Sequence, residues 1–368
     1  MTNLRRLWNN WAPHPIKCMT SASFSFSFLV LGTLTFALLY NLDLTSIFGP
    51  KGKGVCFDEW SFQRSGLLNA SARIRIIPSS PLGKATDLEL QDREESKRQG
   101  KEAEENESSL NTQCIPIPAP PYKSPKDSVT ICIHDPEKDK IISAYLKRHS
   151  EWERENIQAL YYAHLAHPDM MLVDLGCNLG VFTLQAAYMG MQVLAVDAMM
   201  SSLKLLQKSL FINGLSCHVT IVNNALYRER MTMRLSLDPI NVGGSRVVEL
   251  LASREDKITQ KNLINAICLD DLLPLVKGRE VFLKMDIEAS EDAVLECADQ
   301  FFKEVNVKVF LLEWLYFRNQ EDKARAIVSF LILHDMKPVW DLEHKRDIDI
   351  QAAHAWPDNV FWIKNVKH

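Results

Sequence analysis

Two carboxylates and a pair of glycines are spaced so that they could hold a nucleoside. An apolar run over 171–173 predicts a β-strand, and the chain then reads DLGCNLG over 174–180 before a helix begins; a second apolar run, 192–196, ends in Asp197. A glycine loop lets a ligand lie against bare backbone, and an acid after the next strand can accept hydrogen bonds from both ribose hydroxyls. The spacing therefore predicts a nucleoside site at the carboxyl ends of a parallel sheet.

The same loop distinguishes between two nucleoside cofactors. The dinucleotide fingerprint is Gly-x-Gly-x-x-Gly, whose second glycine admits a pyrophosphate. Here three residues separate Gly176 from Gly180, and Asn178 stands near that second position. The loop begins with an acid, Asp174, which suits a cationic group better than a diphosphate. S-adenosylmethionine offers a ribose, an ammonium and a sulfonium but no phosphate, so we predict this methyl donor; an NAD-dependent dehydrogenase and a turn without a ligand are the alternatives.

Each residue of this loop is expected to contact a different part of the donor. We expect Gly176, Asn178 and Gly180 to bring backbone close to its methionine portion and ribose. Asp197 should hold the ribose hydroxyls. Asp174 is the candidate partner of the ammonium, directly or through water; alternatively, it is a turn or helix-capping carboxylate.

Further polar residues follow later strands. Asn224, after the third predicted strand, is placed at the adenine edge, with Asn223 as an equally spaced competitor. Asp286 and Glu288 follow the fourth strand, and residues i and i+2 of an extended backbone point the same way. One of the two could orient the acceptor or take its proton, and Lys284 could lower their pKa values. The alternative is that both carboxylates cap the next helix and hold the loops of the site.

The elements that must position these residues alternate between helix and strand. An amphipathic helix leads into the first strand, and the helix after Asp197 is expected to begin at Ser201-Ser202 and to end at Asn213-Gly214. The other predicted elements are strands at 218–222, 281–283 and 309–312, a hairpin of 231–237 with 247–250, a helix after 319, and an antiparallel pair of 337–340 with 360–363. This order predicts an α/β fold with a Rossmann-like, doubly wound, mostly parallel sheet.

Composition and cysteine spacing exclude some classes of site. A net charge of -4 and the absence of a basic, aromatic-laced stripe argue against a nucleic-acid partner. The eight cysteines show no metal spacing, and no metal site is predicted. A disulfide among Cys56, Cys114 and Cys132 would suit an oxidising compartment. The cysteines at 177, 217, 268 and 297 are expected to be small buried hydrophobic residues.

The motif VDLGCNLGVFTL at 173–184 resembles the FkbM-type S-adenosylmethionine-dependent methyltransferases. Further family matches follow in order: AVDA at 195–198, NG at 213–214, NA at 224–225, NVGGS at 241–245, LDDL at 269–272, LKMDIE at 283–288 and LLE at 311–313. The resemblance covers about 150–365 and implies a class I methyltransferase fold with S-adenosylmethionine as the donor. The chain departs from the family pattern twice, with Ala289-Ser290 where a glycine and an aromatic residue are usual, and Asp197-Ala198 where Glu-Pro is usual.

The N-terminal third reads as an anchor and a stem. Residues 18–42 contain no charged side chain, and this segment is long enough for one membrane span. The charged residues before it are all basic, so the positive-inside rule predicts a cytoplasmic tail over 1–17. A cleaved signal peptide is the alternative. Residues 43–126 are predicted to be a flexible lumenal stem with glycosylation sequons at Asn69 and Asn106, and residues 127–368 to be the methyltransferase domain.

These features predict a type II membrane protein of the Golgi that methylates a carbohydrate hydroxyl on glycans. Its partners would then be a glycan acceptor and, through residues 18–42, the lipid bilayer. Two alternatives remain: methylation of a lipid, protein or small molecule, and a catalytically silent module that binds the nucleoside or a membrane partner.

Overall fold

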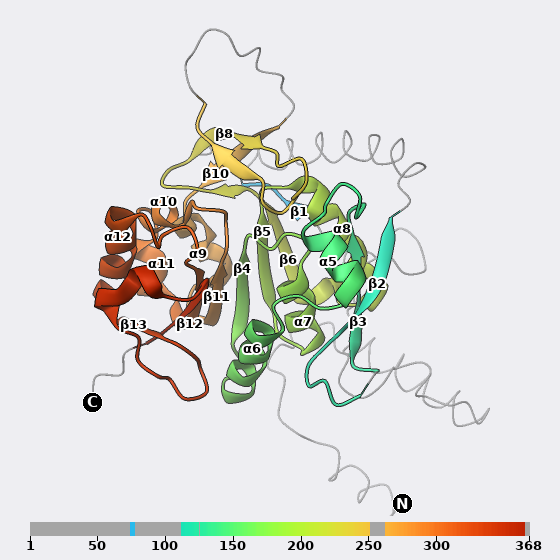
Figure 1. The fold of residues 1–368 in the computed structure, drawn as a ribbon, viewed down its shortest axis with the longest axis horizontal. Coiled ribbons are helices and arrows are strands. Elements are labelled where there is room, and N and C mark those ends of the chain that lie inside the picture. Colours follow the sequence, from blue (N-terminus) through green and yellow to red (C-terminus); the bar gives the residue numbers. More distant parts are fainter. Residues whose placement is uncertain (1–73, 78–111, 125, 251–261, 365–368) are drawn as a thin grey trace, which may run out of the picture. The chain divides into compact units, whose positions relative to one another are not determined.

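An eight-stranded sheet forms the centre of this computed structural model (Figure 1). The structure describes residues 74–77, 112–124, 126–250 and 262–364. The strand order is β1-β6-β5-β4-β11-β12-β14-β13. The bounds are β1 Ile74–Arg75, β4 Met171–Leu175, β5 Val193–Asp197, β6 Val219–Asn223, β11 Glu280–Met285, β12 Asn306–Glu313, β13 Met336–Val339 and β14 Asn359–Lys364.

The sheet is parallel except at one edge. The first six strands in this order, β1, β6, β5, β4, β11 and β12, pair in parallel, while β14 runs antiparallel to both β12 and β13. The predicted doubly wound sheet and its closing antiparallel pair are therefore confirmed. The parallel strands are buried on both faces because each face carries helices, so they consist of nearly continuous apolar runs.

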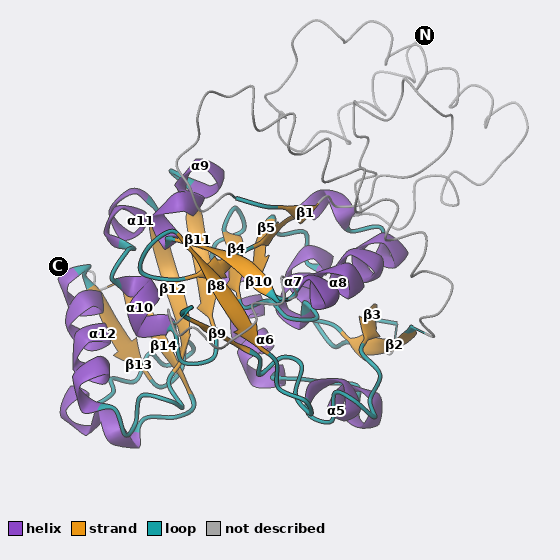
Figure 2. Cartoon of the chain, turned by 90° about the horizontal axis from the view of Figure 1, so that it is seen from above, coloured by secondary structure: helices purple, strands orange, loops and turns teal. Residues whose placement is uncertain are grey.

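Two hydrophobic cores lie on the two faces of the sheet. In β4, Leu172 packs into one core and Val173 into the other, as the alternation of a strand requires. Helices α6, α7 and α8 cover one face and α10, α11 and α12 the other (Figure 2). Their bounds are α6 Arg154–Ala166, α7 Val181–Tyr188, α8 Met200–Asn213, α10 Glu291–Leu295, α11 Asp299–Glu304 and α12 Glu321–Leu333. A short helix, α5 (Ile142–His149), precedes α6.

A second, smaller sheet stands at the carboxyl ends of the main strands. Its order is β7-β10-β8-β9, with bounds β7 Ala225–Leu226, β8 Met231–Ser236, β9 Arg246–Val248 and β10 Leu263–Ile267. Strands β8 and β9 pair antiparallel, which confirms the predicted hairpin. The loop 237–245 between them carries the NVGGS motif to the site.

The folded domain begins before residue 127. Within the predicted stem, β1 pairs in parallel with β6, and β2 (Gln113–Pro118) pairs antiparallel with β3 (Ser128–Ile133). The proline-rich segment 115–121, part of the predicted flexible stem, is thus partly a paired strand. The predicted cytoplasmic tail, the span 18–42, both sequons and the polar part of the stem lie outside the described residues. Within the described ranges, no helix is long and apolar enough to cross a membrane.

The pairing of the cysteines differs from expectation. Cys114 bonds to its cross-strand partner Cys132, and Cys268 bonds to Cys297. Cys217 is also disulfide-bonded, whereas Cys177 is a buried free thiol. The expectation of unpaired, buried thiols was therefore wrong for the cysteines at 217, 268 and 297, because spacing along the chain says little about which strands and loops meet.

Helix α8 begins earlier than its expected serine cap. Met199 is the N-cap residue and makes no side-chain cap bond, so Ser201 and Ser202 lie inside the helix. Gly214 follows the last turn at φ +67°, as the Asn-Gly signal predicted. Phe211, in the last turn of this helix, is 52% exposed.

Candidate functional site

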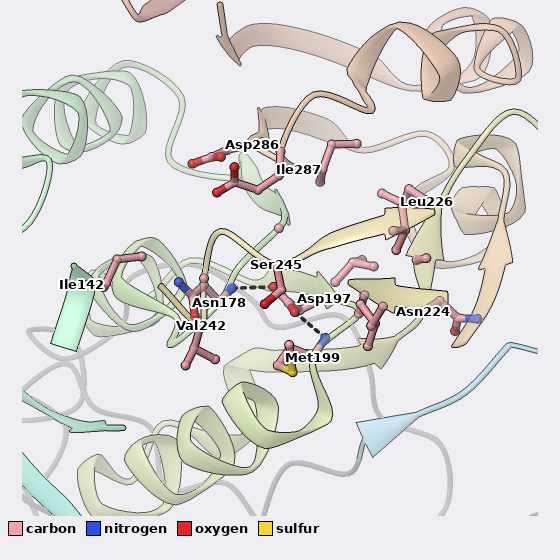
Figure 3. Close-up of a pocket in the computed structure, with 18 residues that line it drawn as sticks. Ile142, Asn178, Asp197, Met199, Asn224, Leu226, Val242, Ser245, Asp286 and Ile287 are labelled. Atoms are coloured by element: carbon pink, nitrogen blue, oxygen red, sulfur yellow. Dashed lines mark hydrogen bonds between the residues drawn. The ribbon is translucent and has the colours of Figure 1, made fainter. Parts of the chain in front are cut away.

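A pocket lies where the central strands end, between the main sheet and the second sheet (Figure 3). We call the β4–α7 loop and the end of β5 the donor side, because the methyl donor is predicted to bind there. The segment after β11, where the acceptor is predicted, is called the acceptor side. The loop 237–245 supplies a further wall. The polar or backbone-presenting lining residues are Gly176, Asn178, Asp197, Asn224, Gly243, Ser245, Asp286 and Glu288.

Asp197 is held against the glycine loop by two backbone hydrogen bonds. Its Oδ2 accepts from the amide of Asn178 at 2.8 Å, and its Oδ1 from the amide of Met199 at 2.6 Å (Figure 3). Each carboxylate oxygen keeps a lone pair for a further donor, so the side chain can still accept two hydroxyls. Burial raises the pKa of Asp197 to about 6 against the effect of both amides. The strand order thus brings this acid and the loop together; the ribose contact stays a prediction.

The two loop glycines are needed for different reasons. Gly176, at φ +75°, lines the pocket, and a Cβ there would lie 1.7 Å from the carbonyl oxygen of Asp286. Gly180, at φ +80°, is the N-cap of α7, and a Cβ would lie 2.3 Å from the side chain of Leu206. Gly180 is outside the pocket lining. Its predicted approach to the donor is replaced by close packing of α7 against α8.

Asp174 lies beneath the pocket rather than on its surface. The side chain is 1% exposed, accepts a hydrogen bond from the hydroxyl of Thr183 at 2.6 Å, and lies 3.8 Å from Nζ of Lys284. Burial raises the pKa of Asp174, and the attraction of Lys284 opposes that rise. A direct contact with a donor ammonium is therefore not available to Asp174 in this arrangement, because it is covered on all sides.

Two asparagines, Asn223 at the end of β6 and Asn224 directly after it, hydrogen-bond to backbone groups. The side chain of Asn224 accepts from the amide of Ile77 at 2.8 Å and donates to the carbonyls of Ile77 and Asn265, so it fastens β1 to the sheet. Asn223 donates to the carbonyls of Asp197 and Ala198. Asn224 also lines the pocket, and its contact with the adenine edge stays a prediction.

Asp286 and Glu288 reach the pocket along a backbone that is not extended. Glu288 and Ala289 both have left-handed conformations, at φ +61° and +72°, so the i and i+2 argument fails although both carboxylates line the pocket. Asp286 lies across the pocket from Met199 (Figure 3). Its Oδ2 is 3.3 Å from Nζ of Lys284.

Lys284 is a buried cation among carboxylates. Its side chain is 7% exposed. Burial disfavours its charge, but Asp286, Asp174 and Glu153 outweigh this effect and raise the pKa of Lys284. The ammonium is thus fixed in its charged form under the pocket.

Glu288 is bound by a tyrosine that sequence patterns did not indicate. The Tyr316 hydroxyl donates to Oε2 of Glu288 at 2.6 Å, and the guanidinium of Arg246 lies over the Tyr316 ring at 4.7 Å. Burial raises the pKa of Glu288, while Tyr316, Arg246 and Lys284 oppose the rise. Lys284 thus lowers the pKa of Glu288, as expected, but desolvation is the larger effect and the net pKa is raised.

Two further acids stand behind the acceptor side. Glu291 is fully buried; its Oε1 accepts from the amide of Ile287 at 2.9 Å, and its Oε2 has no partner among the described residues. Burial raises the pKa of Glu291 to about 8 and, together with the charge of Asp286, that of Glu313 to about 10. Ser290 is the N-cap of α10, so Asp286 and Glu288 do not cap this helix.

The charge of the lining favours a cationic ligand. Three acids line the pocket, namely Asp197, Asp286 and Glu288, and no Lys or Arg is among the described lining residues. These acids would repel a pyrophosphate, and no cation in the described lining would offset that repulsion. A sulfonium and an ammonium would be attracted to the same acids. The residues present therefore fit S-adenosylmethionine better than NAD.

No protein-family model matches this chain, and no curated protein matches its sequence. Among solved structures, similar ones include the precorrin-6y C5,15-methyltransferase of Geobacter metallireducens, with 15% identity, 53% of this chain and 78% of that chain covered and a TM-score of 0.27. A T. thermophilus 16S rRNA N2 methyltransferase, solved with AdoMet and guanosine, is 14% identical over 69% and 50%, with a TM-score of 0.35. A Thermotoga maritima SAM-dependent O-methyltransferase is 11% identical over 61% and 71%, with a TM-score of 0.31.

All three TM-scores lie below 0.5, and the chain covers half the length of the T. thermophilus enzyme. The fold follows instead from the strand order, in which antiparallel β14 stands between β12 and β13 at the end of a parallel sheet. This mixed, mostly parallel sheet with helices on both faces is consistent with the class I S-adenosylmethionine-dependent methyltransferase fold.

Proposed function

We propose that this chain is an FkbM-type S-adenosylmethionine-dependent O-methyltransferase that acts on a carbohydrate hydroxyl. The observation that supports S-adenosylmethionine as the donor is the pocket lining, which has three acids and no Lys or Arg among the described residues. One of these acids, Asp197, is fixed against the glycine loop. S-adenosylmethionine supplies a methyl group on an electron-poor sulfur. Asp197 binds the ribose hydroxyls, and Gly176 and Asn178 present backbone to the rest of the donor.

The acceptor side orients a hydroxyl and removes its proton. Asp286 and Glu288 both line the pocket beside Lys284, and no other titratable side chain of the described residues lines this side. Methyl transfer is an in-line displacement, so most of its acceleration comes from holding the two reactants in line. The loop after β11 serves that purpose because the amide of Asp286 donates to the carbonyl of Leu175 at one end and α10 begins at the other.

A glycan acceptor in the secretory pathway is supported by several features of the chain. Two disulfides lie within the described domain, and disulfides persist in oxidising compartments. The uncharged segment 18–42 and the sequons at Asn69 and Asn106 are consistent with a type II membrane protein of the Golgi with its catalytic domain in the lumen.

The test uses the full chain in detergent with tritium-labelled S-adenosylmethionine and glycans released from cells that lack the gene. We expect label in the glycans, and a methyl mass increment in glycans of cells that express the gene. Label in lipids or proteins alone would contradict the carbohydrate acceptor. Calorimetry that detects no S-adenosylmethionine binding to the wild type would favour a silent module.

A further inference from the structure

A three-residue arrangement at the acceptor side separates the roles of its two carboxylates. Arg246 comes from β9, Glu288 from the segment after β11, and Tyr316 from the segment after β12. The guanidinium lies over the tyrosine ring, and the tyrosine hydroxyl donates to the glutamate. Arg246 thus packs on Tyr316, and Tyr316 in turn bonds one oxygen of Glu288.

The other candidate carboxylate is engaged on both sides. Asp286 faces the ammonium of Lys284 at 3.3 Å, and the carboxyl of Glu313 contacts it from the neighbouring strand. Among the described residues, one hydrogen bond reaches the Glu288 carboxylate; it comes from Tyr316 and engages Oε2. Its Oε1 is left for a hydroxyl that enters the pocket. A general base must reach the proton it removes, so the less encumbered carboxylate is the better candidate.

The backbone at Glu288 is also under strain. Two consecutive non-glycine residues, Glu288 and Ala289, hold left-handed φ angles of +61° and +72°. Such conformations cost free energy and persist only where the surrounding contacts enforce them, commonly at functional sites. The hydrogen bond from Tyr316 is one of those contacts.

We infer that Glu288 is the general base of the proposed methyl transfer and that Tyr316 and Arg246 are the residues that position it. This inference rests on the proposed function. In the step, the Oε1 of Glu288 takes the proton of the acceptor hydroxyl. The acceptor oxygen forms a bond to the methyl carbon, the carbon–sulfur bond breaks, and its electron pair stays on sulfur. The products are a methyl ether, S-adenosylhomocysteine and a protonated Glu288.

The pH dependence of this arrangement has a definite sign. The charged groups that act on Glu288 are Asp286, Lys284, Arg246, Glu291 and Glu313, besides the Tyr316 hydroxyl. The hydrogen bond from Tyr316 favours the ionised carboxylate and so lowers its pKa. Its removal in Tyr316→Phe should therefore raise the pKa of Glu288 and move the acid limb of the rate profile to higher pH.

The chain contains its own matched control. Tyr227 donates to Oε1 of Glu249 at 2.7 Å, and Arg228 lies over the Tyr227 ring at 5.0 Å. This second arginine–tyrosine–glutamate arrangement lies outside the pocket lining. Tyr227→Phe removes the same kind of hydrogen bond without touching the site.

The experiment measures two quantities on the full chain. The first is the titration of Glu288, followed by NMR of protein labelled with 13C at the glutamate carboxyl and assigned with Glu288→Gln. The second is the pH profile of tritium transfer from S-adenosylmethionine to released cell glycans. We expect Glu288→Gln to reduce kcat by about 10²–10⁴-fold. Tyr316→Phe should lower kcat by roughly 10-fold and raise both the NMR pKa and the acid limb, and Tyr227→Phe should change neither.

Different results overturn different parts. Wild-type protein that transfers no label overturns the proposed function and the base assignment, and the NMR titration alone then decides whether Tyr316 positions Glu288. An active wild type with an unchanged Glu288 titration in Tyr316→Phe overturns the positioning. If Glu288→Gln is active and keeps the acid limb of the pH–rate profile, while Asp286→Asn loses that limb, the base is Asp286 instead.

Discussion

The donor side and the acceptor side of the pocket hold their carboxylates by different means. On the donor side, Asp197 accepts two backbone amides, and both come from residues within twenty positions of it. On the acceptor side, Glu288 depends on Tyr316 and Asp286 on Lys284, and the buried acids Glu291 and Glu313 lie near both carboxylates. The donor side is thus fixed by local backbone geometry, while the acceptor side is a balance of buried charges. The first arrangement suits an invariant ligand, and the second can be retuned for a particular acceptor.

The largest effect is expected where the two sides touch. Gly176→Ala places a Cβ 1.7 Å from the backbone oxygen of Asp286 at φ +75°, and backbone cannot move aside cheaply. We expect a loss of roughly 3–5 kcal/mol in the free energy of unfolding, measured by chemical denaturation.

Gly278→Ala is the matched control for that substitution. Gly278 has nearly the same φ, +74°, but no atom of the described residues lies within 4 Å of its added Cβ. Only the left-handed conformation is then penalised, by about 1–2 kcal/mol. Equal losses in the two variants would show that the contact between the two sides contributes nothing.

The buried charge of the acceptor side predicts a pH-dependent stability. Burial raises the pKa of Glu291 from its ordinary 4.5 to about 8, so the folded chain keeps a proton that the unfolded chain releases. Stability from this group is complete below about pH 4.5 and is lost as the pH rises towards 8. Glu291→Gln does not titrate and keeps an acceptor for the amide of Ile287.

The variant should therefore be more stable than the wild type above pH 8, by on the order of 3 kcal/mol. The two should approach each other near pH 5, as denaturation curves across this range will show. Parallel curves at every pH would mean that Glu291 is ionised in the folded chain. The acceptor side would then hold ionised carboxylates, and it would not differ from the donor side in having a buried acid that is protonated in the folded chain.

The same contrast explains how far the sequence alone reaches. The doubly wound, mostly parallel sheet follows from the alternation of apolar runs and helices. Asp197 beside the glycine loop follows from glycines and an acid within about 25 residues, because parallel strands end at one edge. Tyr316 and Arg246 carry no such signal, since they meet Glu288 only through the register of β11 with β12 and the fold of the hairpin. Asp174 was predicted at the donor ammonium, but the structure buries it beside Lys284. This burial follows from the pairing of β4 with β11, which the sequence does not indicate.

Donor affinity should depend on pH through the donor side alone. Burial raises the pKa of Asp197 to about 6, and only the ionised carboxylate accepts two hydroxyls. Calorimetry should find that the affinity for S-adenosylmethionine weakens as the pH falls below 6. Asp197→Asn should bind about 10- to 100-fold more weakly at pH 7.5, since hydrogen bonds to a charged group are lost. Glu288→Gln is the comparison from the acceptor side, and an equal weakening in that variant would contradict the division.

The smallest effect concerns the strained loop of the acceptor side. Ala289 stands at φ +72°, a conformation that costs an alanine about 1–2 kcal/mol but costs a glycine little. Ala289→Gly should therefore stabilise the chain by about 0.5–1 kcal/mol, after the greater entropy of glycine in the unfolded chain is subtracted. Ala293→Gly, in helix α10, is the control of opposite sign, because glycine in a helix costs about 1 kcal/mol. If Ala289→Gly also destabilises the chain, the methyl group of Ala289 makes contacts that outweigh its strain, and the loop is held by packing rather than by the Glu288–Tyr316 bond.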